Sequence, residues 1–134
     1  MAFSDKVLIV DDVAIMRSLL KRILNGFGYE ATSEAESGDE ALRLLEQDDY
    51  GLVMLDINMP GTSGMQTLKS IQALGRPVFV AMVSSHSTAE NVKTAIEIGA
   101  NGFVVKPYTE NKIGDILEKY RRWLDAHVAP ADPV

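Results

Sequence analysis

The chain has no cysteine, a single tryptophan and no long apolar run. Without cysteine there are no disulfide bonds, no thiolate metal sites and no cysteine nucleophile, a composition that fits a reducing compartment. No apolar segment approaches the roughly 20 residues that span a bilayer, and residues 1–6 lack the basic and apolar segments of a secretion signal. We therefore expect a cytoplasmic protein that does not bind a membrane.

Basic residues are also scarce relative to acidic ones. Lys and Arg number 13 against 19 Asp and Glu, which gives a formal net charge of −6 and an isoelectric point near 4.8. Such a chain has no broad cationic surface to neutralise the phosphates of nucleic acid or of anionic lipid. We therefore expect no nucleic-acid partner.

The length of 134 residues leaves room for one domain, because domains commonly run to about 100–150 residues. Apolar residues make up 46% and charged residues 24% of the chain, as in an ordinary globular protein. We expect one domain over residues 1–128, a disordered tail over residues 129–134, where two prolines occur, and no separate effector domain.

Short apolar runs rich in β-branched residues predict four strands. These runs lack the alternation of a half-exposed sheet, which indicates burial on both faces. A fifth segment alternates and suits an edge strand. The four runs are Val7–Val10, Leu52–Leu55, Val78–Val83 and Gly102–Val105, and the edge segment is Glu30–Ala35.

Apolar residues at helical spacing occupy the intervals and predict helices that cover the sheet. The first stripe is Ile15, Leu19, Ile23 and Phe27, and the last is Ile113, Ile116, Leu117, Tyr120 and Leu124. Capping-box spacing marks three helix starts, and glycines that can adopt a left-handed conformation mark helix ends. The capping pairs are Ser37 with Glu40, Ser63 with Gln66 and Ser87 with Glu90, and the terminal glycines are Gly28, Gly75 and Gly99.

Five strand-then-helix units follow one another in this pattern. Repeated units of this kind imply a parallel sheet with right-handed crossovers, so the predicted fold is an α/β, doubly wound five-stranded parallel sheet with five helices. In such a sheet, functional groups gather beyond the carboxyl ends of the strands. Asp11, Asp12, Asp56, Ser84 and Lys106 all stand at those ends.

Three neighbouring carboxylates repel one another unless a cation lies among them. Mg²⁺ is the expected ion, because it prefers oxygen ligands and binds through few carboxylates together with phosphate oxygens. A carboxylate that attacks phosphorus is an established kind of covalent catalysis, and the transferring group needs charge stabilisation more than a general base. The metal and Lys106 would supply that stabilisation.

The pattern resembles the response-regulator receiver family, including its chemotaxis regulators. The resemblance extends from about Lys6 to Trp123, and its combined signature is highly specific although each part alone is weak. It implies a flavodoxin-like strand order of 2-1-3-4-5. The signature consists of Asp11-Asp12, Asp56, Met59-Pro60-Gly61 with Gly64, Ser84, and Lys106-Pro107.

This resemblance implies roles for individual residues. Asp56 is the expected phosphoacceptor, and it would receive the phosphoryl group from a sensor histidine kinase or a phosphotransfer protein. Asp12, Asp56 and the backbone carbonyl of Asn58 are expected to bind Mg²⁺, with Asp11 acting chiefly through bound water. Lys106 would pair with the phosphoryl group, and the bond from Lys106 to Pro107 is the usual cis peptide of the family.

The resemblance also implies how the signal leaves the domain. Ser84 would turn inward to the phosphoryl group and Phe103 would follow as the aromatic switch, altering the face of the fourth helix, fifth strand and fifth helix. A protein target would read that face, with the receiver monomeric or dimerising on phosphorylation. Two positions depart from common members: Ser85 stands where alanine is frequent, and Phe103 stands where chemotaxis members often carry tyrosine. His86 is either a tuner of water access to the phosphate or an exposed loop residue.

Such a domain is not an enzyme with a separate substrate, because it catalyses only its own phosphorylation and slow self-dephosphorylation. A haloacid-dehalogenase-like phosphatase also uses an aspartyl phosphate and Mg²⁺, but it needs a second aspartate where Asn58 stands, and its nucleophile follows the first strand. An unphosphorylated adaptor or a flavin carrier on the same fold is the other alternative. The intact acids and lysine oppose the adaptor, and the absence of a phosphate-cradling loop after the first strand opposes the flavin carrier.

Overall fold

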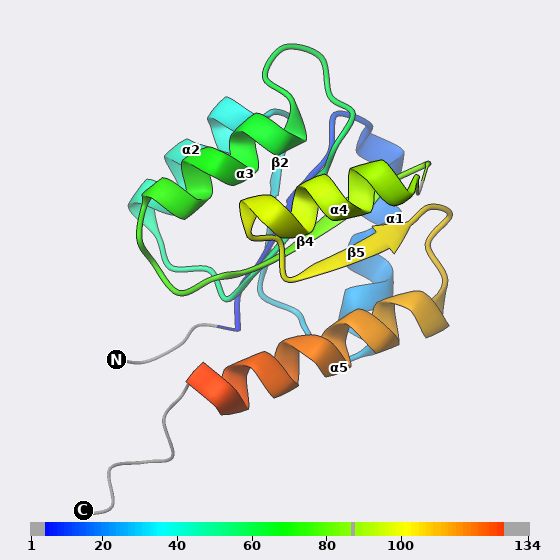
Figure 1. The fold of residues 1–134 in the computed structure, drawn as a ribbon. Helices are drawn as coiled ribbons and strands as arrows, with labels where there is room; N and C mark the ends of the chain where they lie inside the picture. Colours follow the sequence, from blue (N-terminus) through cyan, green and yellow to red (C-terminus); the bar gives the residue numbers. More distant parts are fainter. Residues whose placement is uncertain (1–4, 87, 128–134) are drawn as a thin grey trace, which may run out of the picture.

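Five parallel strands and five helices alternate along the chain in the computed structural model, which describes residues 5–86 and 88–127 (Figure 1). The sheet order is β2-β1-β3-β4-β5. The doubly wound fold and its 2-1-3-4-5 order are therefore confirmed. The elements are β1 (Val7–Val10), α1 (Ala14–Gly26), β2 (Thr32–Ala35), α2 (Gly38–Gln47), β3 (Leu52–Asp56), α3 (Gly64–Ala73), β4 (Phe79–Ser84), α4 (Ala89–Ile98), β5 (Gly102–Val105) and α5 (Glu110–His127).

The sheet separates two apolar cores. Helices α1 and α5 cover one face and α2, α3 and α4 cover the other (Figure 1). Because side chains alternate along a strand, Val7 and Ile9 of β1 enter the first core while Leu8 and Val10 enter the second. Burial on both faces explains why β1 is apolar throughout and why β3 and β4 are apolar up to their last residues, Asp56 and Ser84.

The buried face of α1 differs from the predicted stripe. Leu20 and Leu24 are fully buried, whereas Ile15 is 74% and Phe27 is 44% exposed. Residues four apart on a helix are rotated by about 40° from one another, since a turn takes about 3.6 residues. A row of residues at this spacing therefore turns away from the sheet at its start, where Ile15 lies, and Phe27 follows the last residue of α1. The prediction was wrong for Ile15 and Phe27.

The strand boundaries and edges are close to the predicted ones. β3 extends one residue further to include Asp56, and β4 starts and ends one residue later than predicted. β2 and β5 are the two edge strands, as the order 2-1-3-4-5 implies. The prediction that β5 is buried on both faces was wrong, because Phe103 and Val105 stay partly exposed. An edge strand has only one neighbouring strand, which its apolar composition does not reveal.

Two of the three predicted helix caps are confirmed. Ser37 Oγ accepts from the N–H of Glu40 and Ser63 Oγ accepts from the N–H of Gln66. The third was wrong by one residue, since Thr88 caps α4 by accepting from Asn91 and already has the extended backbone of a cap. Ser87 lies outside the described residues.

The terminal glycines Gly28, Gly75 and Gly99 have positive φ angles, as predicted. The peptide bond from Lys106 to Pro107 is cis. The tail predicted to be disordered lies outside the described residues. Within the described part of the chain, no helix is long and apolar enough to cross a membrane.

Candidate functional site

Three carboxylates meet at the carboxyl edge of the sheet. Asp11, Asp12 and Asp56 each offer an oxygen, and these oxygens all lie within 4.8 Å of one another. β1 and β3 are paired neighbours with Val10 opposite Leu55, so the residues that follow them emerge side by side. Asp11 and Asp56 are buried, and Asp12 is exposed.

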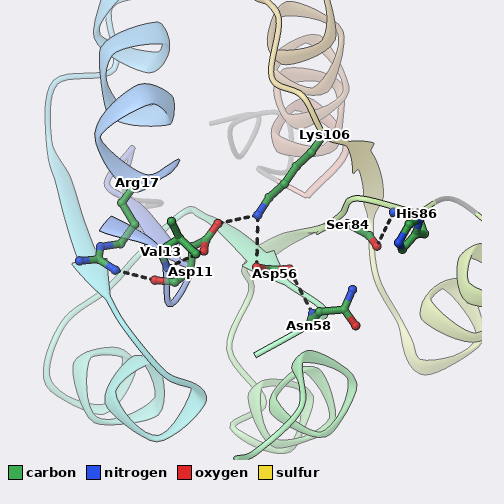
Figure 2. A network of polar contacts seen from close by, with 8 residues as sticks. All are labelled: Asp11, Val13, Arg17, Asp56, Asn58, Ser84, His86 and Lys106. Carbon is green, nitrogen blue, oxygen red and sulfur yellow. Dashed lines mark hydrogen bonds and ion pairs between the residues drawn. The ribbon is translucent and has the colours of Figure 1, made fainter. Parts of the chain in front are cut away.

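Lys106 reaches these acids from the end of β5. Its Nζ lies 2.8 Å from Oδ2 of Asp11 and 3.3 Å from Oδ2 of Asp56 (Figure 2). Its own N–H donates to the carbonyl oxygen of Ser84 at 2.8 Å, which continues the pairing between β5 and β4. The ammonium is thus held between two buried carboxylates by a side chain of which only 13% is exposed.

Main-chain groups orient the two buried carboxylates. Oδ1 of Asp11 accepts from the N–H of Val13 at 2.9 Å, and Oδ1 of Asp56 accepts from the N–H of Asn58 at 3.1 Å (Figure 2). In each acid one oxygen is therefore tied to the loop and the other faces Lys106. This geometry fixes the carboxylates without consuming all their lone pairs.

Burial and charge set the protonation of the site. Burial raises the pKa of Asp56 and the charge of Asp11 adds to the rise, although Lys106 and the Asn58 N–H act in the opposite direction. Burial also works to lower the pKa of Lys106, but its hydrogen bond to Asp11 and the charges of both acids outweigh burial and raise that pKa. Lys106 is therefore a fixed positive charge, while the buried carboxylate of Asp56 is destabilised.

The donor set suits Mg²⁺. Three carboxylates and one ammonium leave a net negative charge, and the ligand oxygens are close enough for a single ion to contact more than one of them. Because Asp12 is exposed, an ion there would keep several waters, as Mg²⁺ does in proteins. The residues present therefore fit the metal that the sequence predicts.

Neither Ser84 nor Phe103 is among the residues that form this cluster. Ser84 is fully buried, and its Oγ accepts from the N–H of His86 at 3.1 Å, turned toward that loop in Figure 2. Phe103 packs on the core beneath α2, α3 and α4. It also lines a cavity of about 260 Å³ between β5 and α5, together with Lys112, Asp115 and others.

Two residues at the site were missed by the sequence reasoning. Arg17 donates to the carbonyl oxygen of Asp11 and pairs with Glu34, a contact across 17 positions that no local pattern signals. Tyr108 is buried, and burial raises the pKa of its hydroxyl, with further rises from Asp11 and Asp56. The sequence offered one signal for Tyr108, which is its position directly after Lys106-Pro107.

Known proteins are similar to this chain in sequence. The family model of the response regulator receiver domain matches residues 7–118. The chemotaxis protein CheY-3 of Vibrio cholerae is 37% identical over 85% of this chain and 89% of its own, and the chemotaxis protein CheY of Pseudomonas aeruginosa is 35% identical over 85% and 94%.

Solved structures agree with the sequence relatives. A receiver domain protein of Methanospirillum hungatei superposes with a TM-score of 0.82 at 28% identity, covering 93% of this chain and 99% of its own. The response regulator TrrA of Thermotoga maritima, solved in complex with Mg²⁺ and BeF, gives a TM-score of 0.78 at 31% identity over 87% and 99%. The chain therefore belongs to the response regulator receiver domain family of two-component signalling.

Proposed function

We propose that this receiver accepts a phosphoryl group on Asp56 from a phosphohistidine of a sensor kinase or phosphotransfer protein. The observation that carries the proposal is the buried Asp56 carboxylate, which ends a central strand between Lys106 and an acidic pair. The TrrA relative, solved with Mg²⁺ and BeF, supports the same chemistry at this site.

An oxygen of Asp56 attacks phosphorus as the bond from phosphorus to the donor imidazole nitrogen breaks, and that nitrogen keeps the bonding electrons. Asp12, Asp56 and the carbonyl of Asn58 would hold Mg²⁺, with Asp11 reached through water. Bound Mg²⁺ would neutralise charge on the phosphoryl oxygens. Lys106 is already 3.3 Å from the acceptor carboxylate, so its ammonium can pair with a phosphoryl oxygen there.

Phosphorylation then alters the protein's own surface. The added charge and acceptor oxygens attract the Ser84 hydroxyl away from the His86 N–H, which opens space for Phe103 to move inward. The face formed by α4, β5 and α5 changes, and a target protein binds it.

Intact-mass spectrometry after incubation with acetyl phosphate, with and without Mg²⁺, tests the proposal. We expect a gain of one phosphoryl group that requires Mg²⁺. The gain should then disappear slowly, through the slow self-dephosphorylation that we propose for the domain. Asp39→Asn, which removes an exposed acid at the start of α2, is the matched control and should still be phosphorylated. A wild-type protein that gains no phosphoryl group with Mg²⁺ present would refute the proposal.

A further inference from the structure

Arg17 connects three separate parts of the chain beside the acidic site. From the second turn of α1, its Nη1 donates to the carbonyl oxygen of Asp11 at 2.7 Å, and its Nε donates to Oε1 of Glu34 on β2 at 3.0 Å (Figure 2 shows the first contact). Only 11% of the Arg17 side chain is exposed. The guanidinium is thus a largely buried bridge from the edge strand to the acidic loop.

The carbonyl group that accepts the hydrogen bond from Arg17 belongs to the peptide between Asp11 and Asp12. The N–H of Asp11 donates to the carbonyl of Ala35, and the Asp11 carboxylate is tied to Val13 and Lys106. The N–H, the carbonyl and the carboxylate of Asp11 are therefore all hydrogen-bonded. In contrast, no hydrogen bond or ion pair holds the Asp12 carboxylate within the described residues, so its position follows from the peptide that precedes it.

We propose that Arg17 is a positioning residue that fixes this peptide and thereby holds the Asp12 carboxylate where it can bind Mg²⁺. This inference rests on the proposed function, because that proposal supplies the Mg²⁺ site. Arginine suits the task because its planar head donates to the Asp11 carbonyl and to Glu34 at once, whereas lysine has a single nitrogen. Glu34 holds the guanidinium in place and offsets its charge.

Arg17 could affect the site through its positive charge or through the position that it gives to Asp12. These two roles predict opposite changes in Mg²⁺ affinity when Arg17 is removed. Loss of a cation beside a metal site should strengthen Mg²⁺ binding if only electrostatics matters. A contribution to folding alone leaves the affinity of the folded protein unchanged. A positioning role weakens binding, and the loss of groups that orient a ligand commonly costs about 10–100-fold in metal affinity.

Calorimetric titration with MgCl₂ separates these cases in Arg17→Ala, Glu34→Gln and the control Arg22→Ala. Arg22 is an exposed cation on the same helix. We expect about tenfold weaker Mg²⁺ binding in Arg17→Ala, a smaller loss in Glu34→Gln, and wild-type affinity in Arg22→Ala. Arg17→Lys should recover part of the affinity, because lysine can still reach one acceptor.

Amide NMR signals of Asp12 and Val13 give a readout that needs no metal. They should move in Arg17→Ala and stay unchanged in Arg22→Ala. Unchanged or tighter Mg²⁺ binding in a folded Arg17→Ala protein would overturn the inference, and Glu34→Gln decides it if Arg17→Ala does not fold. A wild-type protein that binds no Mg²⁺ would instead overturn the proposed metal site, and the Asp12 signals would then decide the role of Arg17.

Discussion

A Cβ atom on Gly64 would lie 2.9 Å from the carbonyl carbon of Asp56 and closer still to its carbonyl oxygen. The same atom would lie 2.6 Å from Cα of Ile57. The N–H of Gly64 donates to the carbonyl of Ile57 at 3.0 Å, so the first turn of α3 rests directly on the end of β3. Glycine is required here by the closeness of two backbones.

Gly64→Ala should therefore displace the end of β3, which carries Asp56. Overpacking of this kind costs about 1–3 kcal/mol, and we expect a fall in the free energy of unfolding at the upper end together with slower phosphorylation by acetyl phosphate. Urea unfolding and the mass assay measure the two effects. Gly26→Ala is the control, since nothing lies within 4 Å of its Cβ position. Equal stability of Gly64→Ala and wild type would contradict the close approach.

Asp56→Asn should abolish phosphorylation and leave the fold intact. In metal-free protein the change should also raise the free energy of unfolding at neutral pH by about 1 kcal/mol, a common size for a single substitution, because burial and the charge of Asp11 disfavour the Asp56 carboxylate. Mass spectrometry and urea unfolding in EDTA test both parts. A full phosphoryl gain in the variant would show that another residue is the acceptor.

The stabilisation by Asp56→Asn should depend on pH. The folded-state pKa of Asp56 is raised by burial, so the folded wild type holds its proton more tightly than the unfolded chain does. Its stability therefore falls as pH rises from the ordinary aspartate pKa, about 3.9, through the raised folded value. The difference between variant and wild type should grow over that range and then level off. A difference that is constant from pH 3.5 to 7 would be inconsistent with a raised pKa.

Asp12→Ala should weaken Mg²⁺ binding by at least about tenfold, since even supporting groups cost that much. Asp11→Ala should weaken it less, because in our proposal Asp11 contacts the ion only through water, and its carboxylate is already engaged by Lys106 and Val13. Calorimetry is the suitable measurement, because Trp123 packs with Phe79 and Tyr120 in the aromatic core, away from the acids. Equal affinities of Asp12→Ala and wild type would remove Asp12 from the ligand set.

Ser84→Ala should still accept a phosphoryl group but bind its target with little dependence on phosphorylation, and Phe103→Ala should lose the same coupling. Such couplings are typically about 1–3 kcal/mol, so the active arrangement should exist as a minor population before phosphorylation. The measurement is NMR shift change on adding beryllofluoride to wild type and both variants. In wild type the shifts should extend over residues 88–120, and shifts confined to the acceptor loop would contradict the switch.

Local chemistry made much of the fold predictable from the sequence. The runs ending at Val10 and Leu55 are apolar at every position because both faces of the sheet are covered, and that composition is visible without coordinates. The caps at Ser37 and Ser63 involve residues three apart, so their spacing was sufficient. Strand ends then placed Asp11, Asp12 and Asp56 at one edge of the sheet, before any distance was known.

The sequence by itself determined the strands, most of the helix limits and the chemical groups at the sheet edge, because each depends on neighbours in the chain. Only the tertiary structure decided which face of α1 is buried, that β5 stays partly exposed, and that Lys106 joins Asp11 across 95 positions. It also decided that Arg17 meets Glu34 and that Gly64 touches the end of β3. Some of these contacts join residues that are remote along the chain, and others depend on how closely two elements approach. Both depend on how the helices and strands pack in three dimensions.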